Sequence, residues 1–224
     1  MPAAEPDIVT SIVEHPKRRG RFVIVSGATE IATVTAEVIS ELQIHVGRAI
    51  DGRTLDALRV HDRRIAVLDR ALRLLSVRGR ATSELSRALL RAKDRPQADD
   101  VKWVIRRLTE QGYLDDTRFA DQFVRDRATT RGWGKERLRQ ELRRRGVATS
   151  NVEPALSQAG EDATLDDARS ALEVARKWRR THSARDPERD RQRLYGFLAR
   201  RGFSPDVIRD AMRAALTDGG AESQ

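Results

Sequence analysis

The chain has 224 residues, of which 39% are hydrophobic and 34% are charged. This composition is typical of a globular protein and unlike that of a disordered or membrane-spanning chain. There are 43 Lys and Arg residues against 34 Asp and Glu residues, which gives a formal net charge of +9. The positive balance favours a nucleic acid or an acidic protein surface as partner. Because the sequence has no cysteine, disulfides, thiolate zinc sites and cysteine nucleophiles are excluded.

The N-terminal residues lack the basic start and apolar stretch of a secretory signal. No apolar run approaches the ~18 residues that a membrane-spanning helix needs. We therefore expect a cytoplasmic protein.

Residues 1–62 differ from the rest of the chain because β-branched residues and turn signals dominate there. The pattern predicts strands and short helices, in chain order strands at 8–13, 22–25 and 31–35 and helices at 36–42 and 51–61. We therefore expect residues 1–62 to form a small β-containing N-terminal element.

From about Arg64 the apolar residues recur at helical spacing in nine successive segments. Leu89, Leu142 and Leu198 take matching places in this pattern, 53 and 56 residues apart. We interpret the recurrence as three tandem three-helix modules at 63–114, 115–161 and 162–217, followed by a flexible tail at 218–224. In the third module we expect an extended loop at 179–186. The predicted fold is mainly all-α, with the modules in an elongated array after the N-terminal element.

The most specific motif ends the third helix of the first module and begins the next module. It comprises Gly112, Tyr113, Leu114, Asp115, Asp116, Phe119, Ala120 and Phe123. Gly112 suits the left-handed position after a helix, and an aspartate suits the cap of the next helix. Tyr113 and Leu114 are expected to pack across the junction, and the two phenylalanines to enter the next core.

This motif resembles the signature of the RecX family, and the following segment, with Gly134, Leu138, Leu142, Arg145 and Gly146, is similar to the family's next helix. The resemblance covers about Ala66 to Ala215 and is strongest in the central module. It implies a regulator that binds the RecA–single-stranded DNA filament and mostly inhibits recombinase, ATPase and co-protease activities. It further implies roles in homologous recombination, DNA repair and the SOS response. We expect the protein to be a monomer and to need no cofactor. Double-stranded DNA is a further expected partner.

Arginines and lysines cluster on the predicted helices, and we interpret the clusters together as a RecA- or DNA-binding strip. For any single arginine, an ordinary solvated helix face is the simpler reading. The candidates are Arg131, Lys135, Arg137, Arg139, Arg143, Arg144, Arg145, Arg176, Lys177, Arg193, Arg200 and Arg201.

Three aspartate pairs, at 99–100, 115–116 and 166–167, offer the carboxylates that a Mg²⁺-dependent nuclease needs. All three stand at predicted helix starts, where capping and the helix dipole favour them. We therefore predict no metal site and no catalytic residue. The alternative function is direct DNA binding by one module acting as a helix-turn-helix, and an enzyme is the less favoured rival.

Overall fold

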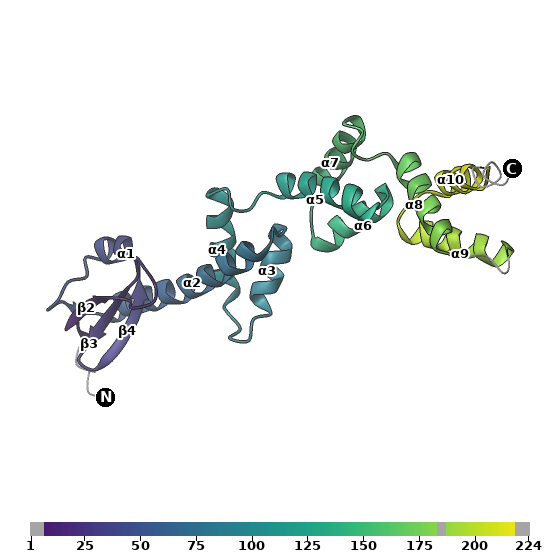
Figure 1. The fold of residues 1–224 in the computed structure, drawn as a ribbon. Coiled ribbons are helices and arrows are strands. Elements are labelled where there is room, and N and C mark those ends of the chain that lie inside the picture. The colour runs from purple at the N-terminus through teal and green to yellow at the C-terminus, as the bar shows by residue number, and fades with distance from the viewer. Residues whose placement is uncertain (1–6, 183–186, 218–224) are drawn as a thin grey trace. The chain divides into compact units, whose positions relative to one another are not determined.

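The computed structural model describes residues 7–182 and 187–217, so the predicted tail at 218–224 lies outside the described residues (Figure 1). The chain divides into two compact units. Unit 1 comprises the described residues up to Gly79 together with Leu85–Tyr113. Unit 2 comprises Arg80–Glu84 and the described residues from Leu114 onward. None of the described helices is long and apolar enough to span a bilayer.

The N-terminal part of unit 1 holds two small antiparallel sheets and a short helix. In chain order these are β1 (Asp7–Ile8), β2 (Ser11–Glu14), β3 (Phe22–Ser26), β4 (Thr29–Val34), α1 (Ala36–Glu41) and β5 (Ala49–Ile50). β2, β3 and β4 form a meander, and β1 pairs with β5. The predicted strand at 8–13 is thus two strands, because the chain turns at Val9 and Thr10 to bond with Arg48 and Val25.

A single 26-residue helix, α2 (Gly52–Val77), replaces the two separate helices that the sequence predicts. The charged run at residues 62–64 lies inside this helix, and each charge has a partner. Asp62 Oδ1 accepts from the Thr33 backbone N–H at 3.3 Å. Arg63 Nε lies 3.1 Å from the buried Asp100 carboxylate, and Arg64 Nε lies 3.4 Å from it. The expected boundary at 62–63 therefore falls inside one continuous helix.

Among the described residues, eight helices follow α2. They are α3 (Thr82–Leu90), α4 (Ala98–Glu110), α5 (Asp116–Arg131), α6 (Lys135–Arg145), α7 (Thr149–Glu161), α8 (Asp167–Thr181), α9 (Pro187–Arg200) and α10 (Pro205–Thr217). We call α5–α7 module 2 and α8–α10 module 3. The mainly α-helical fold with a small N-terminal β element is confirmed.

Each of modules 2 and 3 has its own apolar core. In module 2, Leu138, Leu142 and Leu156 lie in one buried cluster with residues of α5. In module 3, Leu198 and Ile208 lie in a second cluster, in which α8 packs against α10. The expected loop at 179–186 is wrong in its first part, because α8 continues through Thr181, and residues 183–186 lie outside the described part. Ser204 caps α10 by accepting from the Val207 N–H at 3.4 Å.

The signature motif forms the expected helix junction. Gly112 has a φ of 74°, in the left-handed region. Asp115 caps α5 by accepting from the Arg118 N–H at 3.0 Å. Leu114 and Ala120 are buried, and the Phe119 and Phe123 rings stack with centroids 5.9 Å apart. Tyr113, by contrast, is 60% exposed, so its expected packing across the junction is wrong.

Candidate nucleic-acid interface

The arginines of α6 are engaged with acidic neighbours inside module 2. Arg139 binds Glu153 with two hydrogen bonds, from Nε to Oε1 at 2.7 Å and from Nη2 to Oε2 at 2.9 Å. It also contacts Glu136 one turn earlier. These bonds raise the pKa of Arg139, above all the bond to Glu153. Arg143 Nη2 lies 3.7 Å from the same Glu153 carboxylate.

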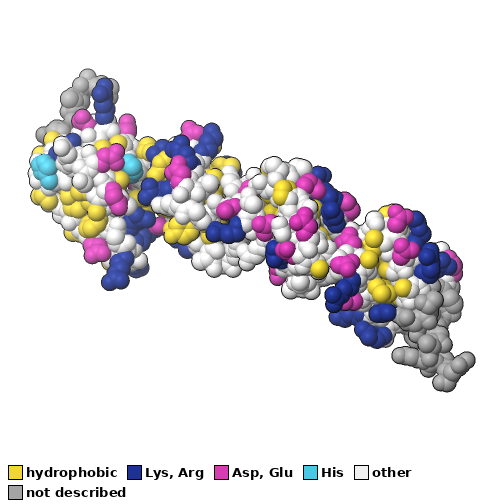
Figure 2. Space-filling model, turned by 90° about the horizontal axis from the view of Figure 1, so that it is seen from above, with side chains coloured by type: hydrophobic (Ala, Val, Ile, Leu, Met, Phe, Trp, Pro, Cys, Tyr) yellow, Lys and Arg dark blue, Asp and Glu magenta, His cyan; other side chains and the backbone are white. Residues whose placement is uncertain are grey.

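The last two arginines of α6 are held in a similar way. Arg144 Nη2 donates to both carboxylate oxygens of the buried Glu141, at 2.9 and 2.8 Å. Arg145 lies over the Phe123 ring, with its guanidinium carbon 4.9 Å from the centroid. On the face seen in Figure 2, lysine and arginine side chains lie beside acidic ones in the same way. Most of the α6 charge is thus tied to the fold of the module.

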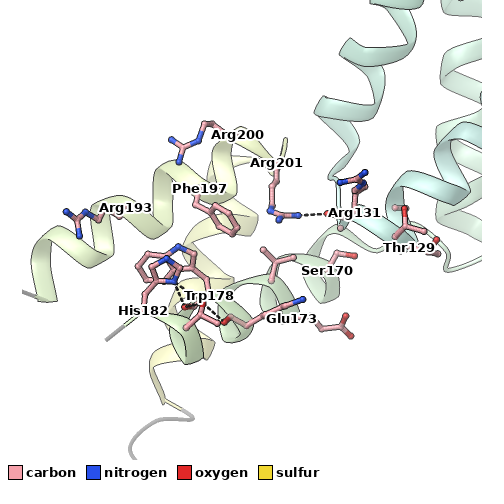
Figure 3. A pocket seen from close by; sticks show the side chains of 16 residues that line it. Thr129, Arg131, Ser170, Glu173, Trp178, His182, Arg193, Phe197, Arg200 and Arg201 are labelled. Carbon is pink, nitrogen blue, oxygen red and sulfur yellow. Dashed lines mark hydrogen bonds between the residues drawn. The ribbon is translucent and has the colours of Figure 1, made fainter. Parts of the chain in front are cut away.

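A groove in unit 2 collects five of the predicted basic residues (Figure 3). It has a volume of about 810 Å³ and lies between the end of α5, α8 and α9. Its cations are Arg131, Lys177, Arg193, Arg200 and Arg201. Glu173 is the one acidic residue among the described residues that line it, and it accepts from Arg169 Nε at 3.1 Å. We call this surface the basic groove; Lys135 and Arg176 are exposed but do not line it.

Three rings line the basic groove among these charges. The Trp178 and His182 rings are parallel within 5°, with centroids 4.3 Å apart. His182 Nδ1 donates to the Trp178 carbonyl oxygen at 2.9 Å, which fixes the imidazole on the indole. The third ring is Phe197 on α9, and the guanidinium carbon of Arg201, just after this helix, lies 4.6 Å from its centroid.

Backbone contacts between modules 2 and 3 hold one side of the basic groove. Gly134 is the N-cap residue of α6 and has no side chain with which to cap it. Instead, the Gly134 N–H donates to the Arg201 carbonyl at 2.8 Å, and the Glu136 N–H donates to the Gly202 carbonyl at 3.2 Å. A Cβ at Gly134 would lie 2.6 Å from the Gly202 oxygen, so this approach requires glycine.

Two arginines complete the junction. Arg137 donates from Nη1 to the Arg200 carbonyl at 2.5 Å and lies over the Trp133 ring, 4.5 Å from its centroid. Arg201 donates from Nη1 to the Arg131 carbonyl. Burial, together with the nearby Arg137 charge, lowers the pKa of Arg201. Arg137 and Arg201 therefore position the groove, whereas Arg131, Lys177 and Arg200 present exposed charge.

This arrangement suits the binding of an anion with a planar part. Permanently charged guanidinium groups suit phosphate, and ring faces suit a stacked base. Among the described residues, no group of three or more His, Asp and Glu side chains could hold a metal ion. Asp166 caps α8 through the Arg169 N–H at 3.0 Å, as predicted for its pair. The Asp99–Asp100 pair does not cap α4, because Asp100 is buried against two arginines.

The sequence did not single out the ring residues of the basic groove as functional. Trp178 follows the apolar period of α8, and Phe197 follows that of α9, so both were indistinguishable from core residues. Trp178 and His182 are four residues apart at the end of a predicted basic segment, and this spacing was the available signal.

These observations define a helical-repeat protein with a basic groove between two of its three-helix modules. A family model described as "RecX, second three-helix domain" matches residues 115–156, and one described as "RecX, third three-helix domain" matches residues 166–212.

Relatives of known name agree with these matches. "Regulatory protein RecX" of Mycolicibacterium vanbaalenii is 39% identical over 153 residues, covering 66% of this chain and 80% of the relative. "Regulatory protein RecX" of Geobacillus kaustophilus is 32% identical over 221 residues, covering 96% and 78%. A solved structure, "Crystal structure of regulatory protein RecX", aligns with a TM-score of 0.70 at 25% identity, covering 91% of this chain and 98% of that one. The chain belongs to the RecX family of regulatory proteins.

Proposed function

We propose that this protein binds the RecA–single-stranded DNA filament and modulates it, mostly by inhibiting the recombinase, ATPase and co-protease activities. The observation that carries the proposal is the basic groove, which gathers five cations in a member of a family of regulatory proteins. Through RecA the protein would tune homologous recombination, DNA repair and the SOS response in the cytoplasm.

The charge and the repeated modules both support a filament as partner. A filament presents DNA phosphates along its length, which attract a basic protein, and complementary charge speeds association. Modules of one design suit contact with a partner that repeats along its length. The protein would act as a monomer without a cofactor of its own, since ATP belongs to RecA.

The protein would act as a regulator without catalytic activity of its own. The aspartates that would serve a nuclease have other partners. Asp115 and Asp166 cap helices, and Asp100 lies between two arginines. Carboxylates engaged in this way are not available to position a metal ion without loss of those bonds.

Binding to preformed filaments tests the proposal. RecA is assembled on single-stranded DNA with a slowly hydrolysed ATP analogue and sedimented with increasing amounts of this protein. We expect saturable co-sedimentation that exceeds the amount bound by the same DNA without RecA. Equal binding with and without RecA would favour the direct DNA-binding regulator instead.

A further inference from the structure

The basic groove combines exposed cations with a stacked pair of rings, a combination that a protein surface partner does not need. We propose that the basic groove binds single-stranded DNA directly, with its phosphates on Arg131, Lys177 and Arg200 and one base stacked at His182. The inference rests on the proposed function in taking DNA as the ligand, and it assigns the rings a role of their own.

The stacked rings of Trp178 and His182 form a flat surface on which a base can stack. Trp178 is buried at the base of the stack, and His182 is exposed above it on the groove lining. The rings are parallel with centroids 4.3 Å apart, so the exposed imidazole is the outer ring of the stack. Because every base has a π face, such a platform accepts a base of any sequence. Figure 3 shows both rings on the α8 side of the groove, opposite Arg193 and Phe197 of α9.

The exposed cations are placed to follow a phosphate backbone. Arg131 ends α5, Lys177 lies on α8 and Arg200 ends α9, so three elements contribute charge to one groove. None of these three side chains forms an ion pair with a residue that the structure describes. Unpaired cations on one concave surface are free to replace the counterions of a nucleic acid.

The size and chemistry of the groove favour one strand over two. Its volume of about 810 Å³ is within the range of roughly 300–1,000 Å³ that concave ligand sites occupy. A duplex keeps its bases stacked internally and offers no base face to His182 without unpairing. The proposed site therefore prefers a single strand.

Fluorescence anisotropy of labelled oligonucleotides tests the base contact without RecA. The probes are oligo(dT), an abasic strand with the same number of phosphates, and a duplex of the same length. We expect oligo(dT) to bind roughly 5- to 150-fold more tightly than the abasic strand, the range of one base–ring stack. His182→Ala should remove this difference, and His182→Phe should keep it.

His45→Ala is the matched control for His182→Ala. His45 is also exposed, and its Nδ1 also lies beside a backbone carbonyl, that of Val46 at 3.1 Å. It belongs to unit 1 and not to the basic groove. Its removal should leave the preference for oligo(dT) unchanged. Thermal melts of each variant check that the fold is kept.

A triple variant, Arg131→Gln/Lys177→Gln/Arg200→Gln, tests the binding of phosphates and is called the groove variant. It should weaken binding of oligo(dT) and the abasic strand alike, and reduce the logarithmic salt slope by about 0.7 for each phosphate that is no longer neutralised. The control variant, Lys102→Gln/Arg106→Gln/Arg209→Gln, removes the same charge from exposed positions outside the groove. It should change the slope much less.

Equal affinity of the native protein for oligo(dT) and the abasic strand would overturn the inference, as would an unchanged preference in His182→Ala. Loss of filament binding in the groove variant with unchanged binding of bare strands would also overturn it, and would assign the groove to an acidic protein surface. If the strand preferences appear as expected but the native protein does not bind RecA filaments, the proposed function fails and the inference stands.

Discussion

Asp167 accepts from the backbone N–H of Lys135 with both carboxylate oxygens, at 3.1 and 3.3 Å. The second aspartate of module 3 thereby binds the start of the middle helix of module 2. Asp116 does the same one module earlier, accepting from the Thr82 N–H at the start of α3 at 2.7 Å. In both pairs the first aspartate caps its own helix. Each acidic pair therefore accepts hydrogen bonds from the first backbone N–H groups of two helices, and so joins consecutive segments of unit 2.

Replacing the second aspartate of either pair should destabilise unit 2. Asp116→Ala and Asp167→Ala each leave a backbone N–H without its acceptor, at a cost of about 1 kcal/mol. Urea denaturation measures the loss. Asp99→Ala is the control, because its side chain is 84% exposed and pairs with Lys102 at the surface. Equal midpoints for all three variants would contradict this role.

Two carboxylates should affect stability with opposite dependence on pH. Arg139 holds the pKa of Glu153 below its ordinary value of 4.5, so the stability that Glu153 contributes is present above that value and is lost as the pH falls. Burial raises the pKa of Asp167 above its ordinary value of 3.8, so stability is lost as the pH rises through the folded-state pKa.

Unfolding of Glu153→Gln and Asp167→Asn across about pH 3 to 7 measures both effects. The free energy of unfolding of the native protein, relative to that of Glu153→Gln, should rise with pH. Relative to that of Asp167→Asn, it should fall as the pH rises. Parallel curves for the two variants would contradict the assignment of their environments.

Gly202 should tolerate alanine less well than Gly112. Both glycines have left-handed backbone, with φ of 86° and 74°, so both variants carry strain of about 1–2 kcal/mol. A Cβ at Gly202 would also lie 2.5 Å from the Arg137 Cβ, whereas one at Gly112 meets nothing within 4 Å. Gly202→Ala should therefore lose about 1–3 kcal/mol more, the cost of overpacking. Denaturant titrations that give the two variants the same loss of unfolding free energy would contradict the close packing of Gly202 against Arg137.

Leu142→Ala should cost about 2–5 kcal/mol, because its side chain is fully buried at the centre of module 2. Leu90→Ala, at a site that is 43% exposed, should cost much less. Thermal and urea unfolding of the two variants provide the comparison. A small loss at Leu142 would show that module 2 tolerates a cavity at its centre.

The helical periodicity predicted the modules because each core depends on local spacing. Leu138 and Leu142 lie four residues apart on α6, and both are buried as expected. The continuity of α2 could not be predicted in this way. Its charged middle, at Arg63 and Arg64, is stabilised by Asp100 from α4, a contact between residues distant in sequence.

The sequence pattern proposed basic candidates but did not indicate which of them lie together in the fold. Arg139 and Arg200 look alike in a helical pattern. One is bound to Glu153 within module 2, and the other lies on the groove. This difference between the two arginines depends on the close approach of Gly134 and Gly202, which brings modules 2 and 3 together. No local sequence pattern specifies that approach.

ATP hydrolysis by the cognate RecA on single-stranded DNA, measured with increasing amounts of this protein, tests the central claim most directly. We expect the native protein and the control variant to slow hydrolysis at substoichiometric amounts, and the groove variant to require more protein for the same effect. Unchanged hydrolysis at saturating native protein would contradict the proposal that this chain regulates RecA.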